Sequence, residues 1–270
     1  MEEQTIGFIG AGNMASSLAG GMIARGMAPE RIRMSDRDQG QREAVSRRHG
    51  IATLDDNAAL ARECDALVLA VKPQQIEEVC TALRPVLAER APLVISIAAG
   101  VPVARLREWL GDGVPVIRTM PNTPSLVQVG ATGLFAGPGV TPVQQALAHE
   151  VLESVGQCFW FEQEEDLDRV TAVSGSGPAY FFLLMEAMIE AGRQQGLDEQ
   201  TARKLVLQTA RGAAELAATG DDDPATLRAR VTSPGGTTAA ALEVFQQGGF
   251  SDLVSRAVDA ARRRAEELGS

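Results

Sequence analysis

Apolar residues in the first part of the chain gather in short continuous runs that end in glycine, proline or small polar residues. The runs occupy residues 6–9, 66–71, 93–97 and 114–118, and a further short strand is predicted at residues 31–35. Runs without a polar face are typical of strands covered by helices on both sides of a parallel sheet. Because helix-periodic segments separate the runs, the pattern predicts an α/β domain with a mostly parallel, doubly wound sheet.

Two further strands are predicted at residues 131–135 and 157–161, with a helix over 142–154 between them. From residue 164 onward the buried-strand pattern ends, and the segments are helix-periodic and rich in Ala, Leu, Arg and Glu. We therefore predict a dinucleotide-binding Rossmann domain over residues 1–162 and an all-α domain over residues 163–270.

In the all-α domain, Asp198, Asp223 and Ser251 stand where helices are predicted to begin, and these residue types favour N-caps. Alanines and glycines recur over residues 210–217 and allow close helix approach. Such residues bury little area within one chain, so we expect this domain to pack against a second copy. A monomer with a compact bundle is the alternative.

The first apolar run breaks into Gly10-Ala11-Gly12 with Ala15 three residues on, just before a helix-periodic segment. In a dinucleotide-binding turn the first glycine allows the tight turn and the second lets a pyrophosphate approach the backbone. The phosphates then lie on free N–H groups at a helix N-terminus, where the helix dipole favours negative charge. The strand before and the helix after this segment favour that interpretation over a merely tight loop.

The second predicted strand ends in Ser35-Asp36-Arg37. An acidic residue at this position usually binds the ribose 2′-hydroxyl of NAD, whereas an arginine favours the 2′-phosphate of NADP. Ser35 and Arg37 can hold a phosphate if the Asp36 carboxylate turns away, which favours NADP modestly. The alternative is an ordinary surface turn.

Two polar segments interrupt the predicted helices, at residues 174–180 before a helix over 181–189 and at residues 231–238 before a helix over 239–245. Each combines glycines, a proline and hydroxyl side chains just before a helix N-terminus, which suits anion binding. Ordinary helix capping is the alternative for either segment. Two such segments in one helical domain beside a nucleotide fold favour a carboxylate-binding site.

The net charge of −10 argues against nucleic acids and anionic membranes as partners. Cys64, Cys80 and Cys158 are widely spaced in apolar surroundings, so we expect reduced thiols and neither a disulfide framework nor a metal site. No apolar run looks long enough to span a membrane, and the acidic N-terminus does not resemble a signal peptide. We expect a cytoplasmic protein.

Groups that could act as a strong base are few, because the chain has two histidines, His49 and His149, and two lysines, Lys72 and Lys204. Both histidines are predicted on solvated helix surfaces, and Lys204 is predicted among core residues within a helix. Removing a proton from a substrate hydroxyl therefore fits poorly. Reduction of a C=N bond fits better, because an imine protonates near neutral pH without a protein base.

The motifs that carry a family resemblance are Gly10-x-Gly-Asn-Met-Ala, Ala70-Val-Lys-Pro, Ile95-Ser-Ile-Ala-Ala-Gly, Met120-Pro-Asn-Thr-Pro, Ser174-Gly-Ser-Gly-Pro-Ala-Tyr and Ser233-Pro-Gly-Gly-Thr-Thr. In this order they resemble Δ1-pyrroline-5-carboxylate reductase, from Ile6 to about Glu267. The resemblance implies reduction of 1-pyrroline-5-carboxylate to L-proline, the last step of proline biosynthesis. It also implies NADP(H), with NAD(H) as the alternative, and an intertwined helical homodimer that assembles further, commonly into a decamer.

The resemblance assigns roles to individual residues. The pyrophosphate would be held by Gly10, Ala11, Gly12, Asn13 and Met14, and the adenosine ribose or its phosphate by Ser35, Arg37 and Asn57. The cofactor cleft would be lined by Val71, Lys72, Pro73, Ala98, Ala99 and Gly100, with Asn122 and Thr123 beside the nicotinamide. The substrate carboxylate would be bound by Ser176, Ser233, Gly236, Thr237 and Thr238, with Thr238 near the ring nitrogen as proton donor or positioning group.

Two other classes remain open at this point. One is a nucleotide-sensing Rossmann protein without catalysis, and the other is a hydroxyacid dehydrogenase, which the lack of a lysine in the helix after Gly177 disfavours. The balance between NADPH and NADH, the number of subunits, feedback by proline and the acceptance of six-membered ring imines also stay open.

Overall fold

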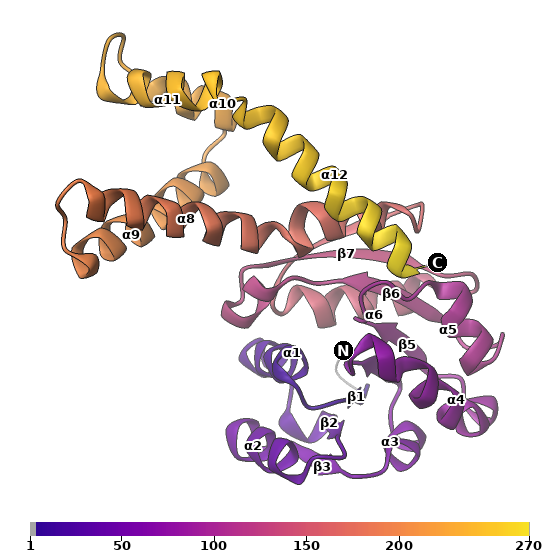
Figure 1. Cartoon of the computed structure of the whole chain (residues 1–270). Coiled ribbons are helices and arrows are strands. Elements are labelled where there is room, and N and C mark those ends of the chain that lie inside the picture. The colour runs from indigo at the N-terminus through magenta and orange to yellow at the C-terminus, as the bar shows by residue number, and fades with distance from the viewer. Residues whose placement is uncertain (1–3, 270) are drawn as a thin grey trace. The chain divides into compact units, whose positions relative to one another are not determined.

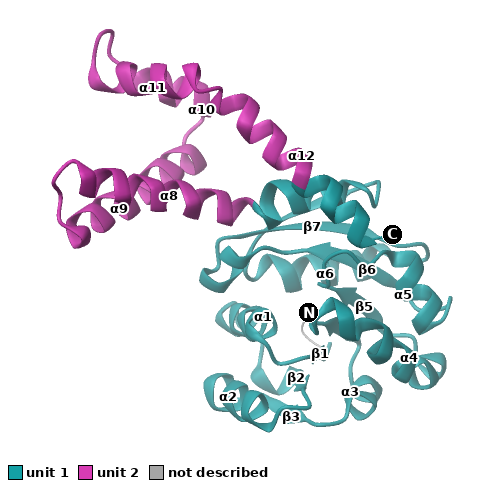
Figure 2. Cartoon of the chain, in the orientation of Figure 1, with its two compact units in different colours: residues 1–176, 261–270 teal, residues 177–260 magenta. Residues whose placement is uncertain are grey.

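The computed structural model describes residues 4–269 (Figure 1). The chain divides into two compact units, unit 1 comprising Met1–Ser176 with Ala261–Ser270, and unit 2 comprising Gly177–Ala260 (Figure 2). Unit 1 contains the sheet, and unit 2 is helical. The domain boundary between residues 162 and 163 stays a prediction.

Unit 1 is built on a mostly parallel sheet, as expected. Within the described residues the strand order is β3-β2-β1-β4-β5-β6-β7-β8, with only the β6–β7 pair antiparallel. The strands are β1 (Ile6–Ile9), β2 (Ile32–Ser35), β3 (Ala52–Leu54), β4 (Ala66–Leu69), β5 (Leu93–Ser96), β6 (Val116–Met120), β7 (Gly130–Ala136) and β8 (Gly156–Phe161). In register, Ile6 of β1 faces Ile32 of β2 on one side and Ala66 of β4 on the other.

Helices flank the sheet because the central strands are apolar on both faces. Along β4, Ala66 and Val68 join one buried cluster with α1 and α6, whereas Leu67 and Leu69 join a second with α3, α4 and α5. The helical elements of unit 1 are α1 (Asn13–Ala24), η1 (Pro29–Arg31), α2 (Gln39–His49), α3 (Asn57–Glu63), α4 (Pro73–Glu89), α5 (Val103–Leu110), η2 (Thr123–Val127), α6 (Pro142–Glu153), α7 (Asp166–Val170) and the π-helical η3 (Thr171–Gly175).

The remaining helices are α8 (Gly177–Gln194), α9 (Glu199–Thr219), α10 (Pro224–Arg230), α11 (Thr237–Gln247) and α12 (Phe250–Gly269). Asp198 caps α9 by accepting from the Thr201 N–H at 3.0 Å, and Asp223 caps α10 by accepting from the Thr226 N–H at 2.7 Å, which confirms both predicted caps. The prediction for Ser251 was wrong, because α12 already begins at Phe250.

Much of the apolar surface of unit 2 is exposed in the single chain. Phe181, Phe182 and Leu183 on α8 are between 62% and 67% exposed. The helical stretch Asp166–Gln194 is long and apolar enough, by length and composition alone, to cross a membrane, which contradicts the expectation that no run is long enough. Only 11% of its apolar window is buried, so this surface is available to a partner.

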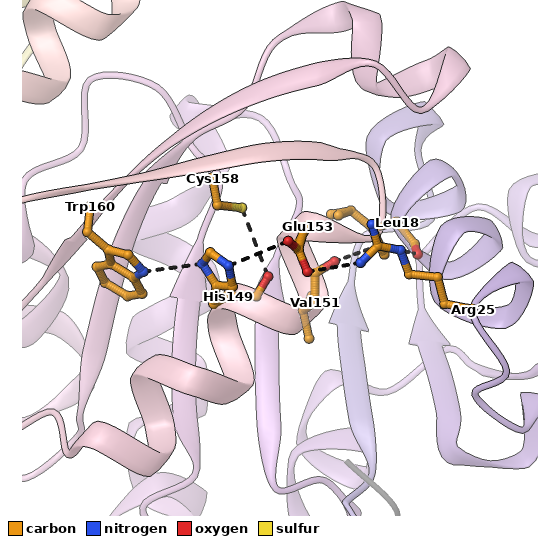
Figure 3. A network of polar contacts seen from close by, with 8 residues as sticks. Leu18, Arg25, His149, Val151, Glu153, Cys158 and Trp160 are labelled. Carbon is orange, nitrogen blue, oxygen red and sulfur yellow. Dashed lines mark hydrogen bonds and ion pairs between the residues drawn. The ribbon is translucent and has the colours of Figure 1, made fainter. Parts of the chain in front are cut away.

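Two expectations about single residues, His49 and Lys204, were wrong, whereas His149 lies on the surface of α6 with its side chain 37% exposed, as predicted. His49 is half-buried against α1, with Nε2 2.9 Å from the Ser16 hydroxyl, and burial lowers the pKa of its imidazole. Nδ1 of His149 accepts from Trp160 Nε1 at 3.3 Å, in a network that links β8 to α6 and α1 (Figure 3). Lys204 is exposed on α9.

The cysteines agree with the prediction of reduced thiols. Cys64 and Cys80 are buried and Cys158 is half-buried, and all three are free. Burial raises the pKa of each thiol to about 12, so the reactive thiolate form is suppressed. Among residues 4–269, no group of three or more His, Cys, Asp or Glu side chains is placed to hold a metal ion.

Candidate functional site

The glycine turn between β1 and α1 has the geometry that a bound pyrophosphate requires. Gly10 has φ +101°, and a Cβ on it would lie 2.6 Å from the Ala70 carbonyl oxygen, so only glycine fits there. Gly12 is the N-cap of α1 and provides no side-chain cap, and a Cβ on it would meet nothing within 4 Å. The first turn of α1 carries no acidic residue. The N-terminal N–H groups of α1 therefore adjoin open space in which an anion fits.

The Asp36 carboxylate holds this turn in place. Its Oδ2 accepts from the Ala11 N–H at 2.8 Å, and its Oδ1 accepts from the Asp38 N–H at 2.9 Å. Both oxygens are thus committed to backbone donors of this chain. A ribose 2′-hydroxyl could bind Asp36 only by sharing these carboxylate oxygens with the backbone donors. Asp36 is therefore less suited to recognise the ribose of NAD.

A pocket of about 210 Å³ opens at the carboxyl ends of β1, β2 and β4. It brings together seven of the residues predicted to bind the cofactor: Gly10, Gly12, Ser35, Arg37, Asn57, Val71 and Lys72. Its other lining residues are Ile9, Asp36, Ala70, Gln75, Glu78 and Val79. The crevice beyond the strand ends of a doubly wound sheet is where such folds bind ligands.

Polar side chains in this pocket are already ordered. The buried Ser35 hydroxyl donates to Asn57 Oδ1 at 2.7 Å, which fixes the amide at the start of α3. The Arg37 guanidinium extends toward α4 and pairs with Glu78 at 2.5 Å, and this hydrogen bond raises the pKa of Arg37. The pocket residues contributed by α4 were not predicted from the sequence. Their spacing places Gln75, Glu78 and Val79 on one face of that helix.

The other predicted cofactor residues do not line this pocket. Ala11 is buried and Met14 half-buried, whereas Asn13 and Pro73 are exposed in the first turns of α1 and α4. Ala98, Ala99 and Gly100 follow β5, and Gly100 has φ +74°. Thr123 is exposed at the start of η2. All of these residues belong to unit 1.

The Asn122 side chain forms hydrogen bonds to two other segments of unit 1, which was not predicted from the sequence. Its Nδ2 donates to the Ser174 carbonyl at 3.1 Å, and its Oδ1 accepts from the Ala131 N–H at 2.9 Å. The side chain, which is 9% exposed, thereby ties the end of β6 to β7 and η3. The amide is therefore engaged at both ends within the chain.

The predicted substrate residues are divided between the two units. Ser176 closes η3 in unit 1, and its N–H donates to the Thr171 carbonyl at 2.8 Å. In unit 2, Gly235 has φ +69° and Gly236 is the N-cap of α11 without a side-chain cap. Ordinary capping thus does not explain the hydroxyls of Ser233, Thr237 and Thr238, and the N–H groups at the start of α11 remain free for an anion.

A buried ionic cluster in unit 1 was missed altogether. The Arg118 side chain, only 6% exposed, pairs with Glu164 at 3.0 Å and with Asp168 at 3.2 Å. Glu164 Oε1 also accepts from the Val103 N–H at 2.8 Å, so the cluster joins β6, the start of α5 and the segment leading into α7. The only signal in the sequence was an arginine within an apolar run.

Two family models match the chain. Residues 164–268 match the model for pyrroline-5-carboxylate reductase dimerisation, and residues 5–100 match the model for coenzyme F420-dependent NADP oxidoreductases. The second match covers the glycine turn and all of the residues that line the pocket.

Curated relatives and solved structures extend the similarity over the full chain. A pyrroline-5-carboxylate reductase of Pseudomonas aeruginosa is 49% identical over 268 residues, covering 99% of this chain and 98% of that protein. The structure of a pyrroline-5-carboxylate reductase from Coxiella burnetii superposes with a TM-score of 0.95 at 43% identity, covering 99% of both chains. That of Plasmodium falciparum pyrroline carboxylate reductase with NADP bound has a TM-score of 0.88 at 32% identity and covers 100% of both chains.

Proposed function

Because the chain belongs to the pyrroline-5-carboxylate reductase family, we propose that it reduces 1-pyrroline-5-carboxylate to L-proline with NAD(P)H as hydride donor. It is an oxidoreductase that acts on a C=N bond in the last step of proline biosynthesis. The observation that carries the assignment is the pocket beside the uncapped N-terminus of α1, in a chain that matches these reductases from end to end.

The nicotinamide supplies the hydride when the cofactor is bound, and the chain binds and orients the reactants. We assign the pyrophosphate to the α1 N-terminus at Gly12 and the adenosine ribose with its phosphate to Ser35, Arg37 and Asn57. Val71, Lys72 and Pro73, with Ala98, Ala99 and Gly100, are assigned to the rest of the cofactor cleft. Asn122 positions the segment beside the nicotinamide through its two hydrogen bonds.

We assign the substrate carboxylate to the free N–H groups at the start of α11, with the hydroxyls of Ser233 and Thr237 as further donors. Ser176, which belongs to unit 1, stays a prediction from the family resemblance. Thr238, in the first turn of the same helix, is assigned to the ring nitrogen. A protonated imine accepts hydride without a protein base, so orientation by hydroxyl and backbone donors suffices. The helix that follows Gly177 carries no lysine, which disfavours a hydroxyacid dehydrogenase reaction and supports the imine.

Replacement of Gly12 with valine is expected to leave the fold intact and to weaken binding of NADP⁺ by about tenfold or more. A Cβ at this position meets no protein atom within 4 Å, but the valine side chain occupies the space where the pyrophosphate approaches the backbone. Isothermal titration with NADP⁺ measures the effect. Gly113→Val is the matched control, because a Cβ there also meets nothing within 4 Å and the residue does not line the pocket. Equal affinities in the two variants would contradict the assignment.

The helical region is a dimerisation domain by its family match, and we propose that two chains pair through it. The exposed apolar side chains of α8 support this arrangement. Assembly of five such dimers into a decamer is proposed from the family resemblance. Light scattering at micromolar concentration tests the dimer, and a monomeric mass would contradict it.

Because the net charge is −10, we do not propose nucleic acids or anionic membranes as partners. We propose that the enzyme is cytoplasmic.

The assay that tests the reaction follows NADPH consumption with pyrroline-5-carboxylate, identifies proline as product, and is repeated with NADH. Turnover of the six-membered ring imine in the same assay measures how narrow the substrate pocket is. Tight NADP⁺ binding without turnover of either imine would contradict the proposed function and favour a nucleotide-sensing protein.

A further inference from the structure

The charged side chains around the cofactor pocket are not equally available to a ligand. Four of them line it: Asp36, Arg37, Lys72 and Glu78. The Asp36 carboxylate is committed to two backbone N–H groups. Arg37 lies two residues beyond the end of β2, where this fold binds a 2′-phosphate, and it is paired with Glu78. The only carboxylate in the pocket that faces a phosphate-binding cation is therefore Glu78.

We propose that Glu78 sets the cofactor selectivity of this enzyme by competing with the 2′-phosphate of NADP(H) for Arg37. The proposal rests on the function proposed above, because it concerns the same dinucleotide site. NAD(H) has no 2′-phosphate and leaves the Arg37–Glu78 pair intact. Binding of NADP(H) requires its 2′-phosphate to replace Glu78 as the partner of the Arg37 guanidinium. The phosphate then lies close to the negatively charged Glu78 carboxylate, which repels it. Glu78 thus lowers the preference for NADP(H) without touching the nicotinamide.

The geometry allows this exchange to occur readily. The Arg37 and Glu78 side chains are 72% and 64% exposed, and pairs with this exposure are weak because water screens them. A phosphate with a charge of about −1.5 to −2 is a stronger partner for a guanidinium than a single carboxylate. The pair therefore reduces the affinity for NADP(H) but does not prevent its binding.

Glu78→Gln is expected to strengthen NADP⁺ binding by about threefold to tenfold and to leave NAD⁺ binding unchanged. Titration calorimetry of the full-length protein with each nucleotide measures both dissociation constants without any substrate. Glu77→Gln is the matched control, because it removes the same charge from the adjacent exposed position of α4, which does not line the pocket. Equal changes for NADP⁺ and NAD⁺, or equal effects of the two variants, would overturn the proposal.

A second variant separates competition for Arg37 from simple repulsion. In an Arg37→Met background, Glu78→Gln is expected to lose most of its effect on NADP⁺ binding, because there is no guanidinium left to release. A full effect in that background would overturn the competition. These titrations use no imine, so they test nucleotide selectivity separately from the reaction. A chain that binds NADP⁺ selectively but reduces no pyrroline-5-carboxylate would contradict the proposed function, and the role of Glu78 in selectivity would still be tested.

Discussion

Replacement of Arg118 with methionine is expected to lower the free energy of unfolding by about 3 kcal/mol. The guanidinium lies almost wholly buried between Glu164 and Asp168, whose side chains are only 21% and 16% exposed. Its removal leaves two carboxylates close together with no cation to balance them, and removing one partner of a buried ion pair is costly for that reason. Urea unfolding of the variant and the parent chain measures the difference.

Arg105→Met is the matched control for this effect. Arg105 pairs with Glu108 at 3.2 Å, but both side chains are more than half exposed, so the loss is expected to stay below about 1 kcal/mol. Addition of Glu164→Gln and Asp168→Asn to the Arg118 variant removes both negative charges and is expected to recover part of the stability. A loss in Arg118→Met no larger than in Arg105→Met would show that the cluster contributes little.

Replacement of Thr238 with alanine is expected to lower kcat by about a hundredfold, which is the lower end of what a positioned proton donor contributes. Thr238 lies half-buried in the first turn of α11, and the helix does not depend on it for capping. The fold is therefore expected to survive the change. Steady-state rates with saturating NADPH and pyrroline-5-carboxylate measure the effect.

The control for Thr238 is Thr238→Ser, which retains the hydroxyl and is expected to keep most of the activity. Unfolding temperature, molecular mass and NADP⁺ affinity should be unchanged in both variants, because Thr238 is not assigned to the nucleotide. An unchanged kcat in Thr238→Ala would remove Thr238 from the reaction and leave the role of ring-nitrogen partner to another hydroxyl of the same segment.

The buried strands and the glycine turn could be predicted because their causes are local. A strand such as β4 is apolar at every position, and the backbone at Gly10 requires a residue without a Cβ. By contrast, β3 is only three residues long and none of them is buried, so no apolar run marks it. Ser251 shows the limit of capping rules, because they identify a suitable residue but not where the helix begins.

The contacts that were missed join residues distant in the chain. Arg118 and Glu164 meet only because β6 lies beside the segment that leads into α7, and Arg37 meets Glu78 only because both line the same pocket. An arginine in an apolar run signals that a partner exists, but sequence spacing does not say which carboxylate it is. The pocket residues that followed a motif were predicted, and those contributed by a helix face were not.

The division of the chain has a practical consequence for anyone who trims it. The chain leaves unit 1 after Ser176 and returns to it at Ala261, so the helical unit is an insertion rather than a tail. The returning turns of α12 contribute Ala265, which is 6% exposed, and Leu268, which packs close to Gly100. Expression of a minimal nucleotide-binding fragment that stops near residue 162 would delete this closing segment. A fragment that joins residue 176 to residue 261 through a short linker would retain it.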